Sequence, residues 1–208
     1  GCEDIPVIPT YSPSNILRQW ELRVVAVADM IKAGRFLRGE MRPPVRRLLL
    51  EPTKAEVFEW LQTHYHSIPR PLSRPVSFDI ETKRETITCI GFSIDPSEGI
   101  CIPFYDPAQT DGNYWRSLED ELDVWLAVKE VLEGPDPKLG QNGLYDIQYC
   151  YRYGIHVENY KHDTMIRHHA MYPEMEKGLG FMASVYTDEA PWKMLRNRNK
   201  DNHKLDDE

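Results

Sequence analysis

The sequence predicts an α/β domain built on a mixed sheet. Three observations lead to this prediction. Short segments with alternating apolar and polar residues follow one another from residue 76 to residue 105, a helical period begins at Leu118, and helical and extended segments then alternate as far as Tyr186. Consecutive strands favour antiparallel pairing and strands separated by helices favour parallel pairing, so we expect one mixed sheet of five strands flanked by helices.

The composition of the chain is that of a globular protein. Its 208 residues are 41% hydrophobic and 28% charged, with a formal net charge of -8, which argues against a generally basic surface that clamps nucleic acid. The four cysteines are scattered and form no Cys-x-x-Cys pair, which fits a reducing, cytoplasmic setting. No apolar run approaches the length of a membrane span, so we expect a soluble protein with no membrane partner.

The first seventy residues read as an N-terminal extension. Prolines break up residues 5–13 apart from a short strand near Val7, and a helix is expected from Ile16 or Leu22 to Ala33, ended by Gly34. Residues 39–52 carry Arg42, Arg46 and Arg47 among three prolines, directly after Arg38, and are interpreted as an extended linker, either a solvated connector or a contact for phosphates. We place the domain boundary between residues 1–70 and residues 71–208.

The elements around the first strands follow from capping and alternation. A capping box, Thr53 with Glu56, begins a helix that ends near His64 to Ser67. His64 and His66 are two residues apart and do not share a helix face, so they are not interpreted as a metal pair. Strands are expected over residues 76–82, 85–94 and 99–105, and a helix over residues 118–132.

The second half alternates strand and helix. We expect the following elements: a strand at 137–141, a turn at Asn142-Gly143, a helix at 144–153 ended by Gly154, a strand at 155–160, a helix at 164–171 capped by Asp163, and a helix at 179–186. Beyond Pro191 the chain is basic and polar without periodicity.

The segment Val76-Ser-Phe-Asp-Ile-Glu-Thr82 places two acids on one strand face. Asp79 and Glu81 alternate with apolar residues, so both side chains point to the same side of the predicted strand. Two carboxylates this close repel each other, and a metal ion or a basic partner would neutralise them. The alternative is an edge strand that carries two solvated acids.

Two further motifs lie downstream of this strand. Asn142-Gly-Leu-Tyr-Asp146 places Asp146 in the first turns of a helix, and His162-Asp163-Thr164-Met165 heads the next helix. With Asp79-Ile-Glu81-Thr82, these motifs resemble those of the DEDD 3′-to-5′ exonucleases of ribonuclease H-like fold, and within them the proofreading domains of family A DNA polymerases. The resemblance covers about residues 72–195 and includes Gly178 to Tyr186.

The resemblance implies a metal-dependent mechanism. Asp79, Glu81 and Asp146 would be the catalytic and metal-binding residues, holding two divalent cations, Mg²⁺ or Mn²⁺, for in-line attack of water on the terminal phosphodiester. The residues implied to bind substrate are Thr82, Asn142, Tyr145 and Asp163. The implied partners are the 3′ end of single-stranded DNA and a polymerase domain of the same parent polypeptide.

The sequence departs from the family at its fourth acid, which the family carries in a Tyr-x-x-x-Asp or His-x-x-x-x-Asp motif. Tyr186-Thr-Asp188 has the wrong spacing, and His203 is followed by Glu208 at the place of the aspartate. We interpret the chain, which begins at Gly1 and ends at Glu208, as a piece of a longer polypeptide whose final helix lies beyond it, with weak or absent activity. A pseudo-exonuclease is the other interpretation.

The segment Thr10-Tyr-Ser-Pro-Ser-Asn-Ile-Leu-Arg18 is similar to the loop and helix near the end of uracil-DNA glycosylase-like domains. Ser12 stands where such domains have histidine, so no glycosylase activity is inferred, but the resemblance fits a phage-type polymerase acting inside its host. The alternatives for the whole chain are an RNA-directed exonuclease of the same superfamily and a catalytically inactive module that binds nucleic acid.

Overall fold

The computed structural model describes residues 7–42, 45–70 and 72–189. The chain divides into two compact units, a sheet unit of residues 45–167 and a helical unit made of residues 1–44 and 168–208. Of the helices in the described ranges, none combines the length and the apolar character needed to cross a bilayer.

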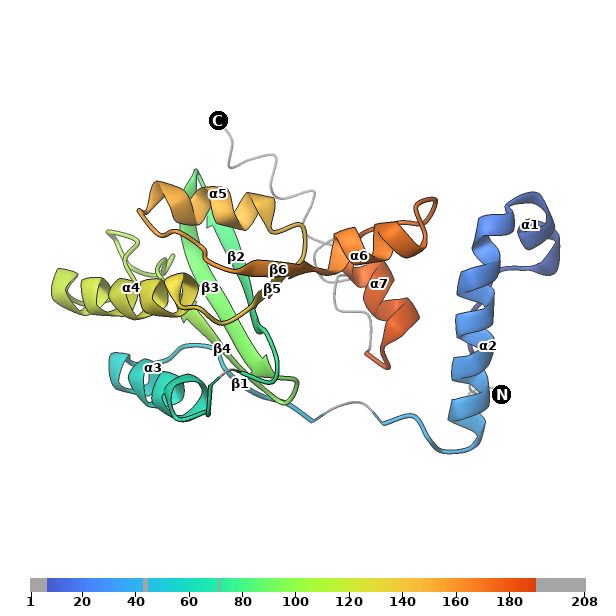
Figure 1. Cartoon of the computed structure of the whole chain (residues 1–208), viewed down its shortest axis with the longest axis horizontal. Coiled ribbons are helices and arrows are strands. Elements are labelled where there is room, and N and C mark those ends of the chain that lie inside the picture. Colours follow the sequence, from blue (N-terminus) through green and yellow to red (C-terminus); the bar gives the residue numbers. More distant parts are fainter. Residues whose placement is uncertain (1–6, 43–44, 71, 190–208) are drawn as a thin grey trace. The chain divides into compact units, whose positions relative to one another are not determined.

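The sheet unit contains a six-stranded mixed sheet (Figure 1), in the order β1-β4-β3-β2-β5-β6. Its strands are β1 (Arg47–Leu49), β2 (Val76–Lys83), β3 (Thr86–Asp95), β4 (Glu98–Pro103), β5 (Lys138–Gly140) and β6 (Tyr160–Asp163). β2, β3 and β4 pair antiparallel, whereas β1 pairs parallel with β4, and β5 pairs parallel with both β2 and β6. The predicted α/β fold with a mixed sheet is confirmed.

Two strands differ from the sequence predictions. The prediction of an extended linker over residues 39–52 is wrong at β1, which adds the sixth strand by parallel pairing of Leu48 with Gly99. The predicted strand at 155–160 is also displaced, because β6 begins only at Tyr160, where Lys138 of β5 pairs with it. Both strands are defined by pairing with distant segments rather than by their own sequence pattern.

Helices supply the rest of the core of the sheet unit. They are α3 (Lys54–Leu61), its continuation as a π-helical turn (Gln62–His66), α4 (Leu118–Glu133), α5 (Leu144–Arg152) and the beginning of α6 (Thr164–Met171). The Thr53 hydroxyl accepts from the Glu56 N–H and the Glu56 carboxylate accepts from the Thr53 N–H, which confirms the predicted capping box. β1 and α3 therefore lie inside this unit, although they precede the predicted domain boundary at residue 70.

One face of the sheet packs against these helices. Val76, Phe78 and Ile80 on β2 are buried in a cluster that also contains Val128 and Leu132 of α4. Since side chains alternate along a strand, Ser77, Asp79 and Glu81 point to the opposite face. Burial of the apolar face thus determines the side on which the two acids lie.

The helical unit contains α1 (Pro13–Arg18), a short 3₁₀ helix (Trp20–Leu22), α2 (Arg23–Leu37), the rest of α6 and α7 (Leu179–Tyr186). The expected strand near Val7 is not formed by residues 7–12, and residues 1–6 lie outside the described ranges. α2 also continues past Gly34 to Leu37, and the residue with the left-handed conformation that ends it is Gly39, with φ of 68°. The predicted bounds of α7 are confirmed.

Candidate active site

The register of β2 and β3 places the two acids of β2 above small neighbours. Asp79 pairs with Gly91, and Glu81 pairs with Cys89. Both acidic side chains are exposed, and Gly91 adds no side chain beside Asp79. The register shifts between Glu81 and Thr82, at a β-bulge of the kind that redirects side chains beside functional sites.

The third predicted acid, Asp146, reaches this strand from α5. Its side chain is buried, and its Oδ1 accepts a hydrogen bond of 3.0 Å from the backbone N–H of Ile80, the residue between Asp79 and Glu81. Burial raises the pKa of Asp146, the charges of Glu81 and Asp163 raise it further, and the Ile80 N–H opposes both effects. The described surroundings of Asp146 therefore disfavour its charged form.

Thr82 and Tyr145 also meet at this point. The Thr82 hydroxyl and the Tyr145 phenol share a hydrogen bond of 2.6 Å between their oxygens. Tyr145 immediately precedes Asp146 on α5, and Thr82 immediately follows Glu81 on β2. The strand and the helix that carry the predicted acids are thus joined twice, once by Asp146 and once by Tyr145.

Asp163 fixes the turn that leads into α5. Its Oδ2 accepts from the Gly143 N–H at 3.0 Å and from the Tyr160 phenol at 2.7 Å, and its Oδ1 accepts from the Ile166 N–H at 3.1 Å. Burial of Asp163 raises its pKa, but these hydrogen bonds, with one from the Asn142 N–H, outweigh burial and lower it overall. The predicted helix cap at Asp163 is confirmed, and the same carboxylate also holds the turn.

The turn before α5 depends on the residue types at Asn142 and Gly143. Asn142 has φ of 58°, a left-handed conformation that asparagine tolerates better than most residues. A Cβ atom on Gly143 would lie 2.2 Å from the phenol oxygen of Tyr160, so only glycine fits. The side chain of Asn142 is exposed.

Further side chains beside the site were not predicted. Cys89 and Cys101 lie on the same sheet face as Asp79 and Glu81, and the Cys101 thiol hydrogen-bonds to Cys89 and lowers its pKa to about 7. The sequence showed Cys89 inside an alternating strand, but only the strand register shows that Cys101 lies beside it. Tyr149 and Arg152 continue the exposed face of α5 beyond Tyr145, a signal present in their spacing of four and three residues.

The residues fit a hard cation in chemistry. Asp79, Glu81 and Asp146 offer oxygen ligands, which Mg²⁺ and Mn²⁺ prefer, and a cation would stabilise the charged form of Asp146 that burial and the neighbouring acids disfavour. Across the described ranges, however, no group of three or more His, Cys, Asp or Glu side chains is placed so as to hold a metal ion. The predicted set is therefore brought to one strand and one helix turn, without forming a complete ligand cluster.

Tyr186-Thr-Asp188, which has the wrong spacing for the family's fourth acid, is engaged within the helical unit. Both oxygens of Asp188 are bound by the guanidinium of Arg35 within the helical unit, at 2.8 and 2.6 Å. The Tyr186 phenol hydrogen-bonds to Nδ1 of His168 at 2.8 Å. His203 and Glu208 lie outside the described residues.

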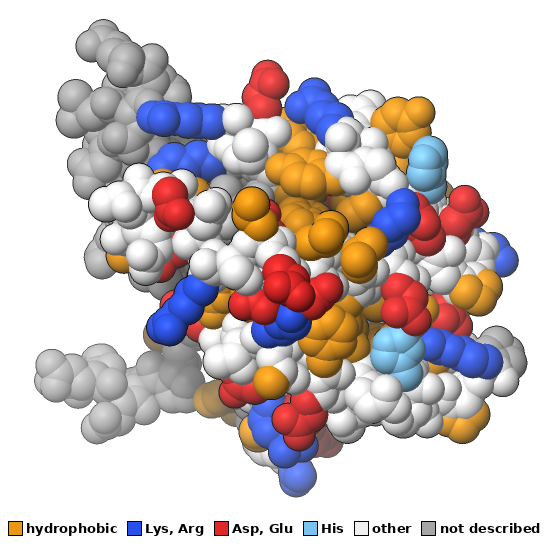
Figure 2. Space-filling model, turned by 90° about the vertical axis from the view of Figure 1, so that its left-hand side faces the viewer, with side chains coloured by type: hydrophobic (Ala, Val, Ile, Leu, Met, Phe, Trp, Pro, Cys, Tyr) orange, Lys and Arg blue, Asp and Glu red, His pale blue; other side chains and the backbone are white. Residues whose placement is uncertain are grey.

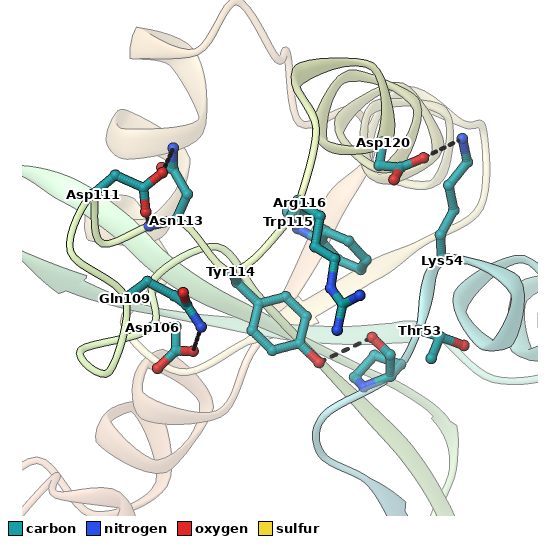
Figure 3. A pocket seen from close by; sticks show the side chains of 11 residues that line it. Thr53, Lys54, Asp106, Gln109, Asp111, Asn113, Tyr114, Trp115, Arg116 and Asp120 are labelled. Carbon is teal, nitrogen blue, oxygen red and sulfur yellow. Dashed lines mark hydrogen bonds and ion pairs between the residues drawn. The ribbon is translucent and has the colours of Figure 1, made fainter.

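A cavity of about 920 Å³ lies elsewhere in the sheet unit, beside the loop between β4 and α4 (Figure 3). Lys54 pairs there with Asp120, Gln109 with Asp106, and the Tyr114 phenol with the Pro52 carbonyl. The residues that line it include none of the predicted site residues. We therefore do not assign the site to this cavity.

Comparison with known proteins gives one family. A family model described as 3′-5′ exonuclease matches residues 53–205, which is more than half of the chain. No curated protein matches the chain.

Several solved structures are distantly similar. One is the POL domain of Pol1 from M. smegmatis in complex with DNA primer-template and dNTP, with 19% identity, a TM-score of 0.48, and coverage of 67% of this chain and 22% of that one. Another is Brucella melitensis NrnC with bound Mg²⁺, with 13% identity, a TM-score of 0.44, and coverage of 71% and 64%. A third is the EXD2 exonuclease domain soaked in Mn and GMP, with 16% identity, a TM-score of 0.40, and coverage of 74% and 75%. The chain spans about a fifth of the first of these.

Proposed function

Because the chain belongs to the 3′-5′ exonuclease family and has its ribonuclease H-like fold, we propose that it removes 3′-terminal nucleotides from single-stranded DNA with the help of divalent cations. One observation carries the proposal. The carboxylate of Asp146 is held against Ile80, so it lies beside the short segment of β2 that carries Asp79 and Glu81. The three acids thus lie on two elements that are distant in sequence and in contact with each other at Ile80.

The three acids would hold Mg²⁺ or Mn²⁺ at this position. When bound, such cations lower the pKa of water and stabilise the negative charge that develops on a phosphodiester. The protein's own contribution is to fix the acids. Asp146 is oriented by the Ile80 N–H, and Asp79 and Glu81 are directed to the open face by the buried residues between and beside them.

The neighbouring polar side chains would hold the terminal nucleotide. The paired hydroxyls of Thr82 and Tyr145 lie next in the chain to Glu81 and Asp146, and the exposed side chain of Asn142 lies in the turn before α5. These groups can donate hydrogen bonds to sugar or phosphate oxygens. Asp163 is buried and its oxygens already accept four hydrogen bonds. We therefore assign Asp163 to positioning Asn142 and Gly143 rather than to direct contact.

Association with a polymerase is a finer proposal. It rests on the motif pattern of Asp79-Ile-Glu81-Thr82, Asn142 to Asp146 and Asp163 to Met165. On the face shown in Figure 2, acidic and basic side chains are interspersed, in keeping with the net charge of -8. With this net charge, we expect binding of a strand to depend on local contacts near the acids.

The test follows a DNA oligonucleotide labelled at its 5′ end through incubation with Mg²⁺ or Mn²⁺. We expect a ladder of products shortened from the 3′ end, which EDTA abolishes and which Glu81→Gln and Asp146→Asn each reduce by at least about a hundredfold. The matched control, Glu119→Gln, removes an exposed acid on α4 and should leave the ladder unchanged. Cleavage that survives in EDTA or in Asp146→Asn would refute the proposal, and an RNA oligonucleotide of the same sequence reports the preferred sugar.

A second candidate is a nucleic-acid-binding module without catalysis. The observation in its favour is that the described acids do not form a complete group of metal ligands. Binding of the oligonucleotide that is the same with Mg²⁺ and with EDTA, and unchanged in Asp79→Ala, would favour this candidate over the enzyme.

A further inference from the structure

Three exposed or half-exposed side chains form a ridge along α5. Tyr145, Tyr149 and Arg152 follow one another at intervals of four and three residues, so they share one face of the helix. The rings of Tyr145 and Tyr149 lie with centroids 4.7 Å apart and planes tilted by 42°. The guanidinium of Arg152 lies over the ring of Tyr149, at 4.6 Å from its centroid. We call these three side chains the α5 ridge.

One end of the α5 ridge lies at the candidate active site. The Tyr145 phenol bonds to Thr82, next to Glu81, and the following residue is Asp146. The other end lies at the turn between β2 and β3, where Arg152 approaches the carboxylate of Glu85 at 3.9 Å. The ridge therefore leads away from the acids along a defined line, with Tyr145 and Arg152 exposed and Tyr149 half-buried between them.

The chemistry of the α5 ridge suits unpaired nucleotides. Aromatic rings offer surfaces on which bases of any sequence stack, and an arginine at the end of the row binds phosphate or stacks on a base. A helix-end arginine alone is explained by the helix dipole. The helix dipole does not explain the two neighbouring tyrosines, which lie between that arginine and the acids with part of their surface exposed.

We propose that the α5 ridge binds the nucleotides on the 5′ side of the terminal one, with bases against Tyr145 and Tyr149 and a backbone phosphate at Arg152. The inference rests on the proposed function, because it assumes that the 3′ end lies at Asp146. It adds a specific property to that function. Affinity should grow with strand length over the first few nucleotides, until the ridge is filled.

The test compares a dinucleotide with a hexanucleotide of single-stranded DNA, both labelled at the 5′ end. Binding is measured by fluorescence anisotropy in EDTA, and cleavage is measured separately with Mn²⁺. In Tyr149→Leu we expect hexanucleotide binding to weaken about tenfold while dinucleotide binding changes little, since one stacked base is lost. In Arg152→Gln we expect a weaker dependence of hexanucleotide affinity on salt, by about one phosphate contact.

The matched control is Tyr151→Leu. Tyr151 lies on the same helix and is 64% exposed, but its ring contacts His156 and lies off the ridge. The Tyr151→Leu protein should bind both oligonucleotides as the unmodified protein does. Leucine retains packing at Tyr149, which is partly buried against the core, and thermal unfolding of each variant verifies its fold.

The outcomes separate the two proposals. Cleavage by the unmodified protein with hexanucleotide binding that ignores Tyr149→Leu overturns the ridge and leaves the proposed function standing. Binding that depends on Tyr149 without any cleavage supports the ridge and overturns the proposed enzyme. Equal losses for both lengths, or the same loss in Tyr151→Leu, also overturn the ridge.

Discussion

The backbone N–H of Ile80 donates a hydrogen bond of 3.0 Å to Oδ1 of Asp146. Ile80 is itself buried on the apolar face of the sheet, so the packing that anchors its side chain also fixes the position of its N–H. The residues on either side of it, Asp79 and Glu81, point away from that core. A single strand position thus links core packing to the relative placement of three acids.

The first prediction concerns the stability cost of the Asp146 charge. Burial and the Glu81 carboxylate raise the pKa of Asp146, so its ionised form is held at a cost in free energy. In Asp146→Asn, whose amide oxygen can still accept from Ile80, we expect the free energy of unfolding in EDTA near neutral pH to rise. Urea unfolding measures it.

Mn²⁺ provides the complementary measurement. It should raise the stability of the unmodified protein by binding to the native state and have little effect on Asp146→Asn. Glu119→Gln, with its exposed acid on α4, should respond to Mn²⁺ as the unmodified protein does. An Asn variant that is less stable in EDTA, or that Mn²⁺ stabilises fully, would contradict this account.

The second prediction concerns how the free-energy cost of the ionised Asp146 carboxylate depends on pH. Since the pKa of Asp146 in the fold is raised above its ordinary 3.8, the native state holds the proton more tightly than the unfolded state. This contribution is fully present below the ordinary pKa and is lost as the pH rises through the raised value. The stability advantage of Asp146→Asn should therefore be small at about pH 4 and grow towards about pH 7.

Urea unfolding of both proteins in EDTA across this range gives the difference directly, because groups remote from Asp146 titrate alike in both. A difference that stays constant or shrinks as the pH rises would show that the fold does not raise the pKa of the Asp146 carboxyl. The same series with Glu119→Gln serves as the baseline.

The third prediction concerns thiol reactivity beside the acids. The hydrogen bond from Cys101 lowers the pKa of Cys89 to about 7, whereas burial raises the pKa of Cys150 to about 12. Because the thiolate is the nucleophile, iodoacetamide near neutral pH should alkylate Cys89 at least about ten times faster than Cys150. Peptide mass spectrometry resolves the sites, including Cys2, which lies outside the described residues.

Cys101→Ala is the control for this effect. It removes the hydrogen bond, so alkylation of Cys89 near neutral pH should slow several-fold and recover at higher pH. Unchanged alkylation of Cys89 in this variant would show that Cys101 does not activate it.

The sequence predicts best what depends on neighbouring residues. The capping box at Thr53, the alternation along β2 and the cap at Asp163 are local patterns, and the structure confirms all three. β1 could not be predicted, because Arg47–Leu49 follows prolines and becomes a strand only through parallel pairing with β4. The start of β6 at Tyr160 likewise depends on its pairing with β5.

For the candidate site, the same division holds. The face shared by Asp79 and Glu81 follows from the period of a strand. The place of Asp146 in the first turn of α5 follows from the predicted start of that helix. The contact of Asp146 with Ile80 and the proximity of Cys101 to Cys89 depend on tertiary packing and strand register. No sequence pattern specifies those distances.

The last prediction separates two roles of Asn142. Its left-handed φ of 58° is a backbone requirement, and its exposed amide is the group proposed to hold the terminal nucleotide. Glycine meets the backbone requirement at little cost, whereas alanine in this conformation costs about 1 kcal/mol. Asn142→Gly should therefore unfold close to the unmodified protein, and Asn142→Ala should lose about 1 kcal/mol in urea unfolding.

Cleavage should follow the amide rather than the backbone. Both variants lack the amide group, so we expect the same loss of kcat/KM on the DNA oligonucleotide, about tenfold or more, despite their different stabilities. Asn159 is the matched control, since it also has φ of 58° but its amide donates to the Pro135 carbonyl at the far end of β6. Asn159→Ala should lose stability and keep cleavage. If Asn142→Gly cleaves normally while Asn142→Ala does not, the residue serves the backbone of the turn and not the nucleotide.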